Sequence, residues 1–290
     1  VAPSAGTKIK IVSNAVDPAN RAEADSTKYR TGEWAVVGDG STTTSIVLSR
    51  PLAITDGLSD DLATRGNPYT TAYNARVLVL QAVAVDLSGL SVSYTEGEAW
   101  TSDAVRISGA DAARVTSPKF GKIYGSALSL SGCYAPRADG LSVSDADNYG
   151  VSITGYGPRV VMPVIHGSRH AVTCPSASMA ADSTDKRTLL AVGRTVGGFV
   201  LGAISHGARD ESPFDTHHDA DDWTFANCIA DGCSAPRAIQ IRGRGIRHIA
   251  PVVRNSVCGA LILTEYSGGD GTFWTSGKTA ADITRGEINA

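Results

Sequence analysis

A short phrase recurs along the chain: Ala104-Val105-Arg106-Ile107, Ala127-Leu128-Ser129-Leu130, Gly150-Val151-Ser152-Ile153 and Ala171-Val172-Thr173-Cys174. In each copy a small residue precedes a short run in which residues expected to face the interior alternate with residues expected to face outward. The copies start 23, 23 and 21 residues apart (104 to 127, 127 to 150, 150 to 171), and the phrase returns at 238–241 and 260–263. Self-similarity at a fixed period of this length is typical of repeat architectures.

A second phrase runs in step with the first. Arg114, Arg137 and Arg159 lie 23 and 22 residues apart (114 to 137, 137 to 159), and Arg247 opens a similar phrase later in the chain. Each of them comes shortly before a strand-like apolar run. Two phrases with one period indicate that a whole multi-strand unit is repeated.

The period predicts the fold. Strands of four or five residues cannot bury a face alone. A coil of roughly 22 residues holds about three such strands, and coils stacked at ~4.8 Å pair each strand with its equivalents above and below. We therefore expect an all-β chain, a right-handed parallel β-helix. A β-sandwich with regular hairpins is the alternative.

The ends of the chain differ from the repeat. Residues 8–12, 33–37 and 45–48 predict strands, and the last two flank a Gly-Asp-Gly turn that suggests a hairpin. We expect residues 1–75 to form a small β module, with a surface loop at 56–75, and residues 76–290 to form the helix. A longer excursion at 176–198 interrupts the repeat, and such loops often lie on the binding face of a solenoid.

Composition limits the function. Hydrophobic residues make up 42% of the 290 residues and the formal net charge is −3, without a basic stripe, so nucleic acid is not an expected partner. No signal peptide and no membrane-spanning apolar run is present, so no membrane insertion is expected. The five cysteines lack metal-type spacing, and buried free thiols are expected. The two ends of the sequence suggest a fragment or a processed product.

One segment is dense in groups that can do chemistry. Residues 206–223 hold six carboxylates and three of the six histidines. If 215–221 is extended, alternate side chains point to one side at ~6.5–7 Å, which suits the ~6.5–9.5 Å that an inverting glycosidase needs. We therefore predict Asp215 and Asp219 as the acid and base and His217 as their orienting residue, with Glu211 as a further catalytic candidate. A solvated turn is the alternative, favoured for Asp221 and Asp222.

Other residues are candidates for binding the substrate. The register of the repeat places Asp145, His166 and Asn255 on one edge, which His206 and Asp231 are expected to join, as a groove wall or as a stacked turn ladder. Arginines can bind acidic sugar groups and aromatic rings can stack on sugar rings, although surface solvation and core packing are the alternatives. The substrate-binding candidates are His166, Arg169, His206, Asp210, His218, Trp223 and Arg242, with Trp100, Tyr149 and Tyr156 as further stacking candidates. No cofactor is expected, and the spacing of the histidines and aspartates matches no standard metal motif.

The repeat, together with the run Phe214-Asp215-Thr216-His217-His218-Asp219-Ala220-Asp221-Asp222-Trp223, resembles bacteriophage tailspikes and pectate-lyase-like β-helix proteins over about residues 77–266. The resemblance implies a homotrimer in the virion, at the phage tail among other tail proteins. It would act outside the host cell on a bacterial capsule, lipopolysaccharide or exopolysaccharide, often cleaving it with paired carboxylates. We expect a glycoside hydrolase. The alternatives are a polysaccharide lyase with His217 or His206 as base, and a non-catalytic adhesin or structural spike.

Overall fold

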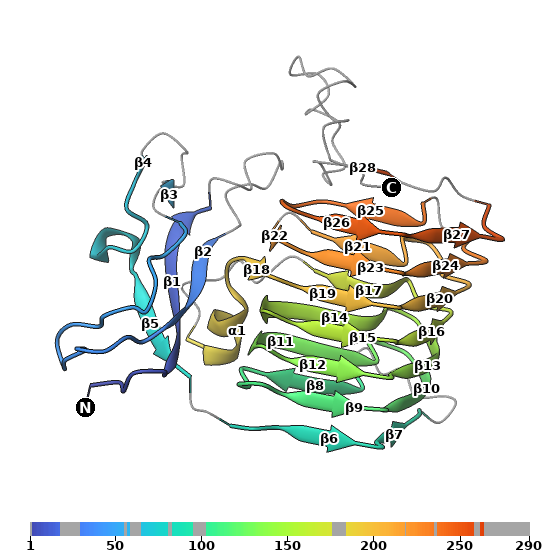
Figure 1. The fold of residues 1–290 in the computed structure, drawn as a ribbon, viewed down its shortest axis with the longest axis horizontal. Helices are drawn as coiled ribbons and strands as arrows, with labels where there is room; N and C mark the ends of the chain where they lie inside the picture. The colour runs from blue at the N-terminus through green and yellow to red at the C-terminus, as the bar shows by residue number, and fades with distance from the viewer. Residues whose placement is uncertain are drawn as a thin grey trace, which may run out of the picture.

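A computed structural model describes residues 2–17, 30–54, 57–58, 65–80, 83–94, 103–175, 184–217, 219–234, 237–257 and 262–263. These residues form a β-solenoid, in which each coil adds a strand to each of three parallel sheets (Figure 1). A small antiparallel sheet from the N-terminal part of the chain lies beside the stack. The parallel β-helix predicted from the repeat is confirmed.

The three sheets of the solenoid are named here in the order in which a coil visits them. In the described residues, sheet 1 contains β6 (Asp86–Ser88), β9 (Arg114–Thr116), β12 (Arg137–Asp139), β15 (Arg159–Val161), β19 (Phe199–Leu201), β23 (Thr224–Ala226) and β26 (Arg247–Ile249). Sheet 2 contains β7 (Ser91–Val92), β10 (Lys119–Ile123), β13 (Ser142–Ala146), β16 (Val164–His166), β20 (Ile204–His206), β24 (Ile229–Asp231) and β27 (Val252–Arg254). Sheet 3 contains β8 (Val105–Ser108), β11 (Leu128–Tyr134), β14 (Tyr149–Tyr156), β17 (His170–Cys174), β21 (Phe214–Thr216), β25 (Ile239–Ile241) and β28 (Ile262–Leu263), and it also includes β18 (Thr195–Val196) and β22 (Ala220–Asp221).

Both repeated phrases are in register in the structure. Leu128 pairs with Val105 on one side and with Val151 on the other, so the small residues that precede them stack as well. In sheet 1, Arg137 pairs with both Arg114 and Arg159. The period in the sequence is therefore the length of one coil.

A left-handed residue follows every strand of sheet 1 and turns the chain into sheet 2. These residues are Gly89, Ser117, Gly140, Met162, Gly202, Asn227 and Ala250, with φ between 48° and 64°. Four of the seven are not glycine, although L residues seldom adopt this conformation. Backbone hydrogen bonds between successive coils hold the turns, for example from Gly140 N to Val161 O at 2.8 Å.

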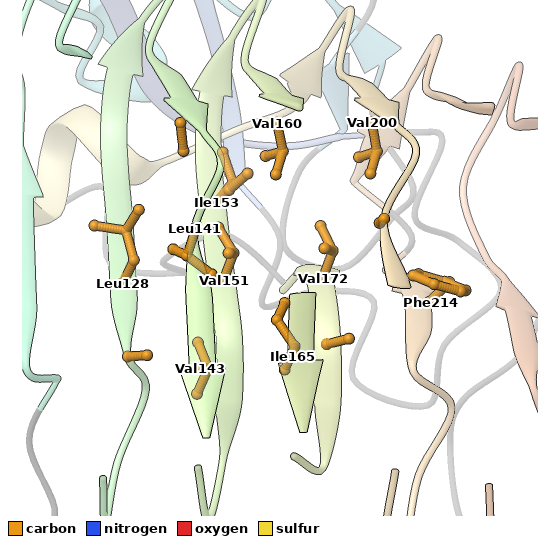
Figure 2. Close-up of a cluster of buried hydrophobic side chains, with 14 of the residues drawn as sticks. Leu128, Leu141, Val143, Val151, Ile153, Val160, Ile165, Val172, Val200 and Phe214 are labelled. Carbon is orange, nitrogen blue, oxygen red and sulfur yellow. The ribbon is translucent and has the colours of Figure 1, made fainter. Parts of the chain in front are cut away.

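The interior of the solenoid is a continuous apolar column. Alternation along each strand sends every second side chain inward. Figure 2 shows Leu128, Val151 and Val172 of sheet 3 facing Ile165 of sheet 2 and Val160 of sheet 1, and each of these residues is completely buried. Full burial stabilises the fold by about 1.5–3 kcal/mol for a side chain of this size.

The N-terminal module is the antiparallel sheet of β1 (Lys8–Val16), β2 (Arg30–Val36), β3 (Gly57–Leu58), β4 (Arg65–Gly66) and β5 (Arg76–Val79). The predicted hairpin forms, but its second strand is reduced to a bridge between Val37 and Leu48. The loop expected at 56–75 is wrong in part, because it contains β3, β4 and the 3-10 helix η3 (Thr71–Tyr73). Since β5 pairs with β1, the module sheet also extends past the boundary expected at residue 75.

The excursion that was expected on a binding face holds the module against the solenoid instead. Its described part contains α1 (Lys186–Ala191), which lies between the two bodies in Figure 1. Val12 of β1 packs against Leu189 and Val192. Arg194 donates two hydrogen bonds of 2.6 Å to Asp17 in an ion pair that is almost fully buried.

Four cysteines lie in the described residues, Cys133, Cys174, Cys228 and Cys233, and all are buried. Cys258 lies outside the described residues. Burial raises the pKa of the Cys133 and Cys228 thiols to about 11, so both are protonated at neutral pH. They act as small apolar groups of the interior.

Candidate functional site

The acidic segment does not run as one extended strand, as the sequence predicted. Strand β21 ends at Thr216, the chain turns, and Ala220 begins the short strand β22. A hydrogen bond of 3.0 Å from Ala220 N to His217 O closes the turn. The expectation that Asp215, His217, Asp219 and Asp221 share one side is therefore wrong.

Asp215 lies at the centre of sheet 3, between Thr173 on β17 and Gln240 on β25. Its neighbour Phe214 points into the core, so Asp215 points to the outer face of the sheet, yet the residue has no exposed surface. Its carboxylate accepts hydrogen bonds from Thr173 Oγ1 at 3.0 Å and from Arg242 Nη2 at 2.6 Å. A buried carboxylate needs such partners, because desolvation of an unpaired charge is costly.

Two histidines flank this carboxylate. His217 Nε2 lies 3.1 Å from Asp215 Oδ2, and the His217 side chain keeps 22% of its surface exposed. His170 Nε2 lies 3.9 Å from the same oxygen, and its Nδ1 donates to the carbonyl of Ser212 at 2.5 Å. Asp215 is thus enclosed by cationic and polar groups, and His217 is the member that reaches solvent.

The charge states follow from these contacts. Burial alone would raise the pKa of Asp215, but the hydrogen bond and charge of His217, with Arg242 and His170, lower it well below its usual range. Burial lowers the pKa of His170, although Asp215 opposes the shift. At neutral pH the cluster therefore contains an ionised Asp215 beside a neutral His170.

Glu211 lies at the exposed edge of the same face. Its carboxylate is 3.6 Å from Arg169 Nη2 and 3.3 Å from Arg237 Nη2, and all three side chains are partly exposed. Tyr149 connects the edge to the buried cluster, because its ring lies 5.3 Å from that of His170. The pKa of Tyr149 is raised, by burial first and also through Asp215 and Glu211.

These residues form one polar surface, which we call the sheet 3 outer site. It consists of Tyr149, Arg169, His170, Glu211, Asp215, His217, Arg237 and Arg242. Six of the eight were candidates from the sequence, Tyr149 as a stacking residue. His170 and Arg237 were not predicted, although His170 directly precedes the repeat phrase that begins at Ala171.

The polar column predicted on one edge is present on sheet 2. His166, His206 and Asp231 are in register, with the two rings stacked at 4.7 Å and His206 Nδ1 3.3 Å from Asp231. Asp145 and Asn255 lie one residue beyond this register, and Asn255 donates to Asp231 at 2.8 Å. The column is therefore a ladder of paired polar groups on the solvent side of sheet 2.

Three predicted site residues do not reach a surface that a polymer could contact. Trp223 is completely buried and donates from Nε1 to Thr195 O at 3.1 Å, so it is a core residue and not a stacking platform. Asp219 is 2% exposed and Asp215 is fully buried, so neither carboxylate faces solvent as the predicted acid and base pair requires. The predicted pair does not form because the segment is divided by a turn into two strands of the same coil, β21 and β22.

The remaining predicted residues are placed as follows. Asp210 is exposed, with a left-handed φ of 65°, in the turn between sheets 2 and 3. Tyr156 faces the module, where the Arg50 guanidinium lies 5.0 Å from its ring centroid. His218 and Trp100 lie outside the described residues.

Two general properties of the described residues bear on function. They contain no group of three or more His, Cys, Asp or Glu side chains arranged to hold a metal ion. They also contain no helix that is long and apolar enough to cross a membrane.

Three parallel sheets closed into a stack define the chain as a β-solenoid of the kind found in phage tailspikes. Similar solved structures are the gp49 tailspike of Pseudomonas phage LKA1 (TM-score 0.58, 14% identity) and the gp61 tailspike of Pseudomonas phage phi297 (TM-score 0.58, 16% identity). The gp54 tailspike of Acinetobacter baumannii phage AP22, solved with a capsular saccharide, is similar too (TM-score 0.52, 15% identity).

Each likeness covers 92% of this chain but only 41%, 40% and 43% of the three tailspikes, in that order. The chain thus spans about two fifths of their length. No family model and no curated protein sequence matches it. At these identities the likeness establishes the fold.

Proposed function

We propose that this chain is part of a phage tailspike that binds and depolymerises a bacterial surface polysaccharide. The fold supports the proposal, because it is shared with three phage tailspikes, one of them solved with a capsular saccharide. The observation that carries it is the sheet 3 outer site, where polar groups with fixed partners reach solvent. Arg169 and Arg237 at its edge suit hydrogen bonds to hydroxyl or acidic groups of a sugar chain.

Within this site His217 takes the proton-transfer role that was predicted for Asp215. His217 Nε2 lies 3.1 Å from Asp215 Oδ2 and 3.0 Å from Arg242 Nη2. In the tautomer whose Nε2 donates to the carboxylate, Nδ1 is the basic nitrogen of the neutral imidazole. Asp215 can then fix the ring and stabilise its protonated form. Glu211 is the partly exposed carboxylate of the same face and supplies the second acid or base for glycoside hydrolysis.

A lyase reaction is the second candidate. The observation that favours it is the pairing of a partly exposed histidine, His217, with a buried carboxylate. Such a histidine can remove a carbon-bound proton. Arg169 or Arg237 would neutralise the uronate of the substrate.

The test is digestion of purified capsule, lipopolysaccharide and exopolysaccharide from Pseudomonas and Acinetobacter strains, followed by size analysis of the products. We expect shortened chains, and a loss of roughly 100-fold or more in rate for His217→Gln or Glu211→Gln, as for removal of an acid or base. Asp86→Asn, which changes an exposed carboxylate of β6 on sheet 1, is the control. Full activity of His217→Gln would refute its role, and binding without shortening would identify an adhesin.

The product distinguishes the two reactions. Both reactions free a reducing end. A lyase leaves an unsaturated sugar on the other fragment that absorbs ultraviolet light, whereas hydrolysis adds water and leaves both fragments saturated. Assembly as a homotrimer, attachment to other tail proteins and a place in the virion are further parts of this proposal. Electron microscopy of phage particles labelled with an antibody to the chain would show whether the chain lies at the tail.

A further inference from the structure

Three arginines form a column on the outer face of sheet 1. Arg137 pairs in register with Arg114 on one side and with Arg159 on the other. The residue that follows each arginine in its strand is completely buried, so the arginine side chains point away from the core. We call Arg114, Arg137 and Arg159 the arginine column. It is the second repeated phrase of the sequence, and the sheet 3 outer site contains none of its residues.

The charges of the arginine column are only partly neutralised. Arg114 and Arg159 are exposed, and the Arg137 side chain keeps 43% of its surface exposed. Arg137 Nε lies 2.6 Å from Asp139 Oδ2, whereas neither Arg114 nor Arg159 has an ion-pair partner among the described residues. Like charges that stand opposite each other on neighbouring strands destabilise a sheet. An anionic ligand that contacts several of these guanidinium groups would relieve this repulsion.

An aromatic ring continues the column on the next strand of sheet 1. Phe199 on β19 pairs in register with Arg159, and β19 follows β15 along the solenoid in Figure 1. Val200, the next residue, is completely buried, so the partly exposed Phe199 ring lies on the outer face. A guanidinium binds a carboxylate or phosphate through two hydrogen bonds, and an aromatic ring packs on the apolar face of a sugar. Both groups in one column suit a saccharide that carries acidic groups.

We propose that the arginine column and Phe199 form a second binding surface, which takes an acidic saccharide chain. The inference rests on the proposed function, because it names the class of polysaccharide that the chain binds. Carboxylate or phosphate groups of the saccharide contact the guanidinium groups, which repeat at the coil spacing of about 4.8 Å. One sugar ring packs on Phe199. This surface lies on sheet 1, so it holds the polymer without taking part in cleavage at the sheet 3 outer site.

The charges around the column favour a polysaccharide over a nucleic acid. The formal net charge of the chain is −3. Asp86 is in register with Arg114 and ends the column, and Asp139 lies beside Arg137. A nucleic acid carries a phosphate on every nucleotide, and proteins bind it mainly through many cationic contacts with these phosphates. A saccharide with acidic groups on only some of its sugars meets fewer repulsive contacts at these two aspartates.

The test is the binding of polygalacturonate, a linear polymer of acidic sugars, measured by isothermal titration calorimetry. Its methyl ester keeps the same backbone and lacks the charges. Arg114→Gln/Arg159→Gln removes two charges from the column. The matched control is Lys119→Gln/Lys122→Gln, which removes two exposed charges from β10 on sheet 2. Circular dichroism would confirm that each variant is folded.

We expect the parent to bind polygalacturonate and to bind the methyl ester much more weakly. The arginine variant should bind polygalacturonate about 5- to 30-fold more weakly, because it loses two exposed ion pairs. The control should keep the affinity of the parent. The difference between the parent and the arginine variant should shrink as salt is added, because salt screens exposed charges. Phe199→Ala should weaken binding at low and at high salt alike.

Three results would overturn the inference: a parent that does not bind polygalacturonate, a control that loses as much affinity as the arginine variant, and tighter binding of single-stranded DNA than of polygalacturonate. Capsule that contains uronates and lipopolysaccharide that carries phosphates distinguish the two sources of acidic groups. A lower affinity of the arginine variant for either polymer supports the inference, and an unchanged affinity for both overturns it.

The proposed function is tested separately by the shortening of bacterial polysaccharides. A parent that shortens one of them but does not bind polygalacturonate would keep the proposed function and overturn the second surface. A parent that binds polygalacturonate through the arginine column, but neither binds nor shortens any bacterial polysaccharide, would support the surface and contradict the proposed function.

Discussion

Sheets 2 and 3 receive strands from the same coils, yet their outer faces meet different surroundings. In sheet 2, strand β16 alternates and ends on the exposed His166, whereas every residue of β17 in sheet 3 is buried. Outward polar residues of sheet 2 can therefore be satisfied by water. Those of sheet 3 must be satisfied by the protein. Asp231 on sheet 2 can therefore be solvated by water, whereas Asp215 on sheet 3 depends on protein groups.

The largest effect is expected at Asp215. Asp215→Asn removes the charge that neutralises the buried Arg242 and should cost about 3–5 kcal/mol of unfolding free energy. Because the folded pKa lies below the unfolded value, the stabilisation is present above pH 4 and is lost as the pH falls further. Guanidinium denaturation at pH 7 and pH 3 would measure it. A change of less than 1 kcal/mol in the free energy of unfolding would contradict the proposed difference between sheets 2 and 3.

A smaller loss is expected at Thr173, which donates to Asp215. Thr173→Val keeps the shape but removes one hydrogen bond to a buried charge, worth about 2 kcal/mol. Ser142→Ala on the exposed face of sheet 2 is the control and should change little. Equal effects of the two variants in thermal denaturation would contradict the comparison.

Lys10 extends the comparison to the module. It is 1% exposed, with Nζ 5.4 Å from the Trp34 ring centroid. Burial lowers its pKa from 10.5 to about 7, although Glu33 and Asp219 oppose the shift. Between pH 7 and pH 10.5 the unfolded chain therefore binds more protons than the folded chain. For this reason the free energy of unfolding rises with pH over this range.

Lys10→Met should remove this pH dependence. We expect about 1–2 kcal/mol of added stability at pH 7, since an apolar residue replaces a buried amine. Melting temperatures measured from pH 6 to pH 10 would show a flatter profile for the variant. The same slope in both proteins would argue against a buried titrating lysine.

The smallest effect is expected at Asp231 on sheet 2. Its partners Arg254 and His206 are partly exposed, and such surface pairs contribute little to stability. Asp231→Asn should therefore lower the free energy of unfolding far less than Asp215→Asn, measured in parallel by guanidinium denaturation at pH 7. A loss as large as that of Asp215→Asn would show that sheet 2 is also enclosed.

The sequence was sufficient for the fold because the period is local and repeated. Gly150 and Ala171 precede the same phrase, and the ladders pair the residues that follow them. The fold of the module was harder to predict, because β5 pairs with β1, which lies far away in the sequence. No short sequence pattern indicates that pairing. The spacing along the chain predicts which residues stack in successive coils. It does not predict what covers the outer faces of the sheets.

The site shows the same limit. Polar density along the sequence pointed to Glu211, Asp215 and His217, and the structure brings these three residues to one face, but polar density did not show that Asp215 is buried. Burial fixes Asp215 between its protein partners and leaves His217 partly exposed. His170 and Arg237 come from other coils, so only the stacking brings them to the site.

The turns between sheets 2 and 3 differ greatly in length while the strands keep their register. Only residues 147–148 join β13 to β14, whereas residues 207–213 join β20 to β21 and 232–238 join β24 to β25. Because neighbouring coils are held by the ladders, these connections can be lengthened, shortened or exchanged without moving the frame. Under the proposed function, exchanging one such connection, for example the one that contains Glu211, is expected to change which polysaccharide binds while the scaffold keeps its fold.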